Sequence, residues 1–311
     1  MTYGSGDHVY ELVEEWAELP GGDSFVDAGR ICVDDNDDVL VLNRSTRPVM
    51  KFGADGTFLA SWGVGYFSDR PHGMAIDSEG DVYCTDDGNH TVRKFSSDGR
   101  HLSTLGTENE PSETGHRHSS DILERIASIE RGAGPFNGPT GVTVPDSGEV
   151  FVADGYGNAR VHVFGPDGEL RRWWGSPGAA PGEFRLPHSI HHDDRGRIWV
   201  TDRETSRIQI FDSDGEFLEE WIDLIRPTDL AIVDGAVFVA ELCKRISVFS
   251  PEGELLTRWG NESHPDGDPL FVAPHTVAAD SNGDLYVGET SAAYAGVDRG
   301  VRTVQKFERV A

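Results

Sequence analysis

The sequence of 311 residues has few lysines and no long apolar run. Only four of its 27 basic residues are lysine, against 54 acidic residues, and the formal net charge is −27. A nucleic-acid-binding protein needs a basic surface, and an anionic membrane would repel this chain, so we expect neither partner. No stretch approaches the ~20 apolar residues of a membrane-spanning helix.

Cysteine is also scarce. Cys32, Cys84 and Cys243 are far apart and form no CxxC motif, which argues against a disulfide framework and against a thiolate zinc site. The acidic residues 1–20 lack the basic and apolar regions of a signal peptide, so we expect a cytoplasmic protein.

The acidic residues are spread along the chain rather than collected in a tail. A dispersed, lysine-poor acidic surface favours adaptation to high salt, because ionic screening relieves the self-repulsion. An ordinary acidic bacterial protein is the alternative interpretation.

One phrase of about 37 residues recurs six times. Each copy joins short runs of β-branched and aromatic residues by Asp- and Gly-rich turns, which predicts four strands per copy. The copies cover residues 27–63, 70–106, 138–175, 186–221, 226–260 and 273–307. Four-stranded units at this period are typical of propeller blades. We therefore predict an all-β, six-bladed β-propeller forming a single domain over residues 1–311.

Two segments depart from the repeat. The last copy lacks its outer strand, and residues 10–16 resemble the outer strand at 254–259, so we expect the N-terminal strand to close the last blade. An insertion covers about 107–137 and contains a short amphipathic segment with Ser or Asp as the helix N-cap. It could be a lid or an inert loop, and the inert interpretation is favoured.

Three histidines occupy one position in alternate copies. His72, His188 and His275 each follow a proline and stand fourteen residues before the acid of their copy. Alternate blades of a six-bladed ring lie ~120° apart, so the three rings would converge at one mouth of the channel. Three neutral histidines with an open fourth position are a ligand set of catalytic zinc. The alternative is that Pro-His is a turn dipeptide whose histidine caps a strand.

A second position follows the acid of each copy and supplies Arg44, Tyr156 and Arg203. Arginine binds a carboxylate through a bidentate fork, and a tyrosine beside a metal can serve as a base. This favours a small-molecule substrate that carries a carboxylate. Rim ion pairs and a rim aromatic are the alternative roles. The other histidines, among them His90 and His116, show no pattern and are interpreted as solvated or structural.

The repeats resemble NHL repeats, and the whole chain resembles the peptidyl-α-hydroxyglycine α-amidating lyase family. The stretches that carry the resemblance include RPHGMAID (70–77), GPTGVTV (138–144), FRLPHSI (184–190) and APHTVAAD (273–280). The resemblance implies that His72, His188 and His275 bind zinc, that Tyr156 is the essential tyrosine, and that Arg44 and Arg203 are the site arginines. The family cleaves a carbinolamide C–N bond and releases an amide and glyoxylate.

Two residues depart from that family. Ala273 stands where the family has a methionine, and Thr276 stands where it has an aspartate tied to a structural calcium. We therefore expect a zinc-dependent lyase acting on a different small α-hydroxy amide. The resemblance also implies a structural calcium ion, but Thr276 removes the carboxylate tied to it, so calcium stays an open alternative. The alternatives are a metal-dependent hydrolase using the same site, and a non-catalytic NHL propeller that binds a protein partner. A calcium lactonase would require carboxylate ligands and fits the histidines poorly.

Overall fold

The computed structural model describes residues 1–310, which fall into two compact units. The first unit combines Met1–Val64 with the segment from Pro227 to the C-terminus, and the second unit is Gly65–Arg226. Each unit contains three antiparallel sheets, and each sheet corresponds to one copy of the repeat. The all-β, six-bladed propeller fold class predicted from the repeats is confirmed.

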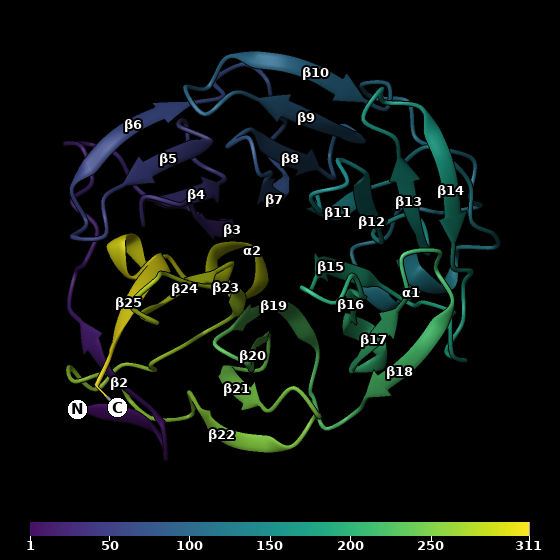
Figure 1. Cartoon of the computed structure of the whole chain (residues 1–311). Helices are drawn as coiled ribbons and strands as arrows, with labels where there is room; N and C mark the ends of the chain where they lie inside the picture. The colour runs from purple at the N-terminus through teal and green to yellow at the C-terminus, as the bar shows by residue number, and fades with distance from the viewer. Residues whose placement is uncertain (311) are drawn as a thin grey trace. The chain divides into compact units, whose positions relative to one another are not determined.

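In the second unit every sheet has four strands in chain order (Figure 1). The second copy forms β7 (Pro71–Ile76), β8 (Val82–Asp86), β9 (Thr91–Phe95) and β10 (His101–Leu105). The third forms β11 (Pro139–Thr143), β12 (Val150–Asp154), β13 (Arg160–Phe164) and β14 (Leu170–Trp174). The fourth forms β15 (Pro187–His192), β16 (Ile198–Asp202), β17 (Arg207–Phe211) and β18 (Phe217–Trp221).

The first unit holds the remaining three sheets. The first copy forms β3 (Ala28–Val33), β4 (Val39–Asn43), β5 (Val49–Phe52) and β6 (Phe58–Trp62). The fifth forms β19 (Pro227–Val233), β20 (Ala236–Glu241), β21 (Arg245–Phe249) and β22 (Leu255–Trp259). The sixth forms β23 (Pro274–Ala279), β24 (Leu285–Glu289) and β25 (Val304–Arg309).

Burial changes across each sheet in a regular way. The second strands β8, β12 and β16 are buried along their whole length, whereas β10 and β18 are mostly exposed. Valine, isoleucine and aromatic residues of the inner strands pack between neighbouring sheets, as Phe151, Ile190 and Phe211 do. Strands that are buried on both faces are nearly continuous apolar runs, as the second strands of these copies are.

The N-terminus completes the last sheet, as predicted. Strand β2 (His8–Val13) pairs antiparallel with β25, with Val13 opposite Lys306, and β1 (Thr2–Ser5) adds a fifth strand outside it (Figure 1). The expected strand over 10–16 ends earlier, at Val13, because the backbone turns at Glu15, which has φ of 49°. Trp16 then packs against Phe52, and its indole N–H donates to the Ala54 carbonyl at 3.0 Å.

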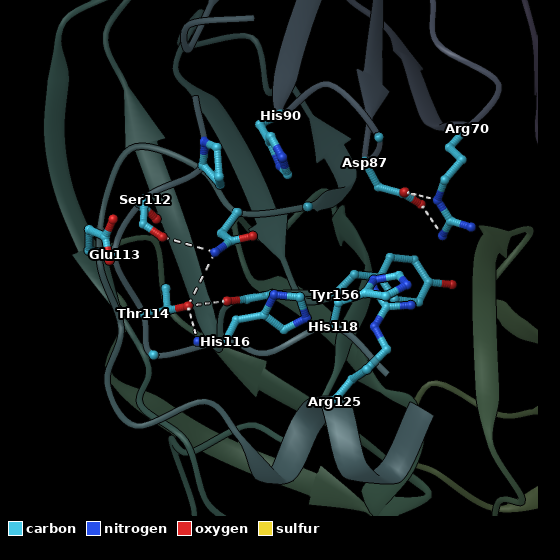
Figure 2. Close-up of a pocket in the computed structure, with 16 residues that line it drawn as sticks. Arg70, Asp87, His90, Ser112, Glu113, Thr114, His116, His118, Arg125 and Tyr156 are labelled. Carbon is cyan, nitrogen blue, oxygen red and sulfur yellow. Dashed lines mark hydrogen bonds and ion pairs between the residues drawn. The ribbon is translucent and has the colours of Figure 1, made fainter. Parts of the chain in front are cut away.

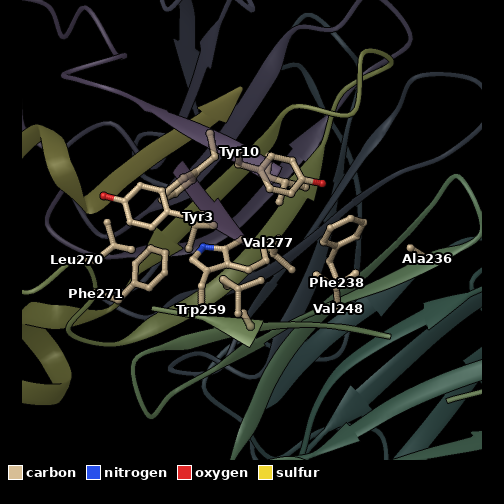
Figure 3. Close-up of a cluster of buried hydrophobic side chains, with 14 residues drawn as sticks. Tyr3, Tyr10, Ala236, Phe238, Val248, Trp259, Leu270, Phe271 and Val277 are labelled. Atoms are coloured by element: carbon tan, nitrogen blue, oxygen red, sulfur yellow. The ribbon is translucent and has the colours of Figure 1, made fainter. Parts of the chain in front are cut away.

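The added strands bring aromatic side chains into a cluster of the first unit (Figure 3). Tyr10 stacks on Trp259 with ring centroids 5.5 Å apart, and Tyr3 meets Phe307 edge to face at 5.7 Å. The cluster therefore joins residues from the two ends of the chain and from the fifth copy through buried apolar area.

Few helices interrupt the sheets. Helix α1 (Ile122–Ala127) lies in the insertion, and the Asp121 carboxylate caps it by accepting from the Leu123 N–H at 2.8 Å, as the sequence predicted. The others are α2 (Ser291–Ala295), η1 (Arg203–Thr205) and η2 (Gly300–Thr303). Among residues 1–310, no helix has the length and apolar character needed to cross a membrane.

Candidate functional site

Two of the three predicted histidines meet in the second unit. His72 is the second residue of β7 and His188 the second of β15, and their ring centroids lie 4.7 Å apart. Both are buried, with 2% and 1% of their surfaces exposed. Nδ1 of His72 lies 2.7 Å from the Thr140 carbonyl oxygen. Because a carbonyl only accepts, Nδ1 carries the proton and Nε2 presents a lone pair.

Tyr156, which follows β12, faces both of these rings. Its hydroxyl lies 3.3 Å from Nε2 of His72 and 3.4 Å from Nε2 of His188. It also accepts from Nη1 of Arg203 at 3.2 Å. Two imidazole nitrogens thus converge on one hydroxyl. The bond from Nδ1 of His72 to a backbone carbonyl is the kind of support that orients a metal ligand.

Three guanidinium groups surround the Tyr156 ring. Arg70, Arg125 and Arg203 have their guanidinium carbons 5.4, 5.7 and 5.6 Å from the ring centroid. Burial opposes the charge of Arg203, but Tyr156 and Glu204 together raise its pKa. Arg70 is paired with the Asp87 carboxylate, which raises its pKa. In a chain of net charge −27, three cations around one ring point to an anionic ligand.

A cavity of about 500 Å³ opens beside Tyr156 (Figure 2). Its wall contains Arg70 and Asp87, and the insertion supplies residues 111–116, His118 and Arg125. Thr114 anchors this segment by donating to the Gly157 carbonyl at 2.6 Å. The insertion thus forms part of the cavity wall, which the favoured interpretation of an inert loop did not include.

The third histidine and the first arginine lie in the first unit. His275 is the second residue of β23 and is 4% exposed, and its Nδ1 lies 2.9 Å from the Gly29 carbonyl oxygen. Gly29 holds the same place in the first copy as Thr140 holds in the third, so His72 and His275 share one tautomer and one orientation within their blades. All three predicted ligands are thus buried, and each has a ring nitrogen able to bind a metal ion.

Arg44 follows β4 and faces the buried carboxylate of Asp27, with Nη1 3.6 Å from Oδ2. Burial raises the pKa of Asp27, while Arg44 and the N–H groups of Ala292 and Ala293 work in the opposite direction. The Arg44 Nε is buried without a hydrogen-bond partner among residues 1–310. Arg44 therefore has donor capacity left beyond this ion pair.

The backbone supports the alignment of the second position. The N–H of Arg44 donates to Asp27 at 3.0 Å, and the N–H of Arg203 donates to Leu186 at 3.0 Å. In both copies the acceptor is a carbonyl just before the innermost strand. The N–H of Asp87 makes the same bond to Arg70, at 3.2 Å. Asp87 is therefore the second-copy equivalent of the two arginines.

The acidic residues at the ends of the second strands hold the backbone in place. Asp86 accepts from the Ser68 N–H, Asp202 from the Leu186 N–H at 2.9 Å, and Glu289 from the Ala273 N–H at 2.7 Å. Each carboxylate is fully buried and holds the chain that leads into an innermost strand. Thr276, at the family's calcium-linked position, accepts from the Ile31 N–H at 3.1 Å.

The model for the NHL repeat matches residues 69–95, 136–164 and 184–211, all in the second unit. NHL repeat-containing protein 3 of Mus musculus is 33% identical over 267 residues, which cover 78% of this chain and 70% of that protein. The chain belongs to the NHL-repeat family. It spans about half of the human protein of the same name, 48% of its length.

This NHL-repeat protein is also similar to named lyases. Peptidyl-alpha-hydroxyglycine alpha-amidating lyase 1 of Drosophila melanogaster is 34% identical over 182 residues, which cover 54% of this chain and 30% of the fly protein. A solved streptogramin B lyase structure aligns with a TM-score of 0.60 and 17% identity over 97% of this chain and 88% of that chain. The structural likeness supports the fold, and the fly protein supports a relation to the amidating lyases.

The cavity also contains residues that no sequence pattern identifies. His90, His116 and Arg125 line it, whereas the sequence predicts only a solvated or structural role for both histidines and gives no signal for Arg125. Asp87 could have been found, because it holds the position of Arg44 and Arg203 in its own copy. His116 and Arg125 lie in the insertion, where no repeat is available for alignment.

Proposed function

We propose that this protein is a zinc-dependent lyase that cleaves the C–N bond of a small α-hydroxy amide carrying a carboxylate. The observation that supports it best is the meeting of the Tyr156 hydroxyl with the Nε2 atoms of His72 and His188. His275 is the third ligand in this proposal, because it has the same offset in the third of the alternate copies and the same Nδ1 bond as His72.

Each residue of the site has its own role in the proposed C–N cleavage. A bound zinc ion would supply a Lewis acid that lowers the pKa of a substrate hydroxyl. Tyr156, in its phenolate form, would take the hydroxyl proton, and Arg203 holds the phenolic oxygen in place. As the carbonyl forms, the C–N bond breaks, its electron pair goes to nitrogen, and the proton taken by Tyr156 passes to that nitrogen. The products are an amide and an α-keto or aldehyde acid, and no oxidant is needed.

The carboxylate of the substrate would bind to Arg44 and Arg203, whose forks suit its two oxygens. We infer from Ala273, which replaces the family's methionine, that the leaving group differs from a peptide amide. Action inside the cell, adaptation to salt, and calcium as a structural ion remain predictions from the sequence.

The first test is the metal content of the purified full chain, measured by elemental analysis. We expect about one zinc per chain, and a sharp fall in His72→Ala, His188→Ala and His275→Ala, because two imidazoles bind a metal far more weakly than three. His101→Ala, which removes a histidine of an outer strand, is the matched control and should keep the metal. Full retention of metal in all three variants would contradict the site.

The second test is a screen of α-hydroxy amides for release of glyoxylate or a related acid. Conversion that requires the metal supports the lyase. A chain that contains no metal and converts nothing would instead favour the non-catalytic propeller that binds a protein partner.

A further inference from the structure

Four residues in the wall of the cavity each have a buried polar atom without a partner among residues 1–310. Nδ1 of His90, Oγ of Ser112, Nε2 of His116 and Nε of Arg125 are all buried and have no hydrogen bond to any of residues 1–310. Buried polar groups are nearly always paired, and each unpaired one destabilises the fold. Four such residues around one cavity make its wall polar, and a small rotation of these side chains would let a polar ligand pair with them.

Charge indicates which kind of ligand. Arg70 is compensated by Asp87, and Arg203 by Glu204 at 2.8 Å, but no ion pair within residues 1–310 compensates Arg125. Burial lowers the pKa of Arg125, and Arg70 lowers it further. A guanidinium nonetheless keeps its charge at any ordinary pH, so the cavity wall holds a cation that has no ion pair of its own among residues 1–310. Asp87 and Glu113 lie in the same wall, and Asp87 acts on Arg125 only at longer range.

The neighbouring histidines add donors rather than further charge. Burial lowers the pKa of His116, with a contribution from Arg125, and burial also lowers the pKa of His90. Neutral imidazoles and the Ser112 hydroxyl can each donate one hydrogen bond. An oxyanion, with several acceptor lone pairs and a negative charge, matches this set of donors.

The position of the cavity relates it to the reacting groups. The Tyr156 ring lies in its wall, while the Tyr156 hydroxyl faces His72 and His188. Figure 2 shows Arg125 reaching from α1 toward this ring, with Arg70 and Asp87 nearby. Arg125 and Arg203 both contact the ring. A molecule with one end at the Tyr156 hydroxyl could therefore place its other end at Arg125.

We propose that this cavity is a second oxyanion site, which binds a carboxylate or phosphate group on the leaving part of the substrate. That the bound group belongs to a substrate rests on the proposed lyase function. The oxyanion site itself is argued from the residues of the cavity alone. The insertion would then select leaving groups that carry their own negative charge. A neutral peptide amide would leave the partly buried Arg125 guanidinium without an ion-pair partner.

Calorimetric binding to the full chain, without turnover, tests this. Inorganic phosphate and succinate are titrated at fixed chloride concentration into wild type, Arg125→Gln and Arg131→Gln. Arg131 is an exposed arginine of the same insertion and serves as the control. We expect Arg125→Gln to weaken the tighter probe at least about tenfold, the worth of a charge-assisted hydrogen bond, and Arg131→Gln to leave it unchanged. All three chains have the same histidines, so binding at a metal cancels in the comparison.

The tighter of the two probes identifies the group, phosphate or carboxylate. Ser112→Ala removes a single oxygen and is the second variant if Arg125→Gln does not fold; it should weaken binding several-fold. The proposal is overturned if wild type binds neither probe, if Arg125→Gln binds like wild type, or if Arg131→Gln loses as much. None of these outcomes depends on metal content or catalysis, so this proposal can fail while the lyase stands.

Discussion

Tyr10 and Tyr156 are both buried, with 1% and 8% of their surfaces exposed, yet their neighbours differ in kind. Tyr10 stacks on Trp259 and meets the edge of Phe238, so apolar area surrounds it (Figure 3). Tyr156 is surrounded by guanidinium groups, and its hydroxyl meets two imidazole nitrogens. Burial alone shows only that a side chain is packed. The charged groups and lone pairs around a buried side chain distinguish a catalytic residue from a structural one.

The sharpest test of this difference is Tyr156→Phe, which removes one hydroxyl and little volume. If the hydroxyl is the base, the turnover rate should fall by roughly 10²–10⁴, the usual worth of a positioned acid or base. The free energy of unfolding should change by only about 1 kcal/mol. Turnover is measured on a substrate found in the glyoxylate screen, with Tyr294→Phe, an exposed tyrosine, as the control. Full turnover with a substrate whose conversion needs the metal would favour a metal-dependent hydrolase instead.

Tyr10→Ala should lower the stability of the fold and leave the metal site unchanged. Removing a buried aromatic ring leaves a cavity in the cluster of Tyr3, Trp259 and Phe307, and we expect unfolding to become easier by about 3–5 kcal/mol. Denaturant unfolding measures this loss, and the metal content of the folded variant should stay at the wild-type value. Tyr294→Ala is the matched control. A Tyr10→Ala chain as stable as wild type would show that the N-terminal strand adds little to the first unit.

A smaller effect separates the two arginines. Arg203→Lys and Arg44→Lys each keep a positive charge but lose the bidentate fork, so kcat/KM should fall roughly tenfold to a hundredfold. Arg131→Lys, at an exposed position, should have no effect. Arg203→Lys also removes the bond from Nη1 to the Tyr156 hydroxyl and should lower kcat as well. If Arg44→Lys changes only stability, Arg44 serves Asp27 and does not bind substrate.

The repeats explain how much could be predicted. The six sheets, the N-terminal strand in the last sheet and the Asp121 cap all follow from local patterns that each copy, or each helix start, carries in itself. The orientation of His72 follows from the same logic, because the repeat places every Pro-His pair at the start of an innermost strand. Where the copies align, sequence position predicts geometry.

The cavity could not be predicted in this way. Arg125 and His116 come from the insertion, whose path depends on contacts such as the bond from Thr114 to Gly157. Arg70 stands two residues before His72, and it pairs with Asp87, which holds the second position of the same copy. Alignment of the copies identifies Asp87, but the contacts of Arg70 and Arg125 with the Tyr156 ring have no local signature.

The smallest expected effect returns to Tyr10. Burial raises the pKa of its phenol to about 12, whereas in the unfolded chain the value is near 10. The folded chain therefore keeps a proton that the unfolded chain has already lost. The stability that depends on the protonated phenol is complete below pH 10 and is lost as the pH rises toward 12.

Tyr10→Phe has no such proton, so its free energy of unfolding should fall less steeply over this range. The other tyrosines with raised pKa values, Tyr3, Tyr83 and Tyr286, are present in both chains and cancel in the difference. A difference between the two chains that stays constant from pH 9 to pH 12 would mean that water reaches the Tyr10 hydroxyl, and that the aromatic cluster is more open than its packing indicates.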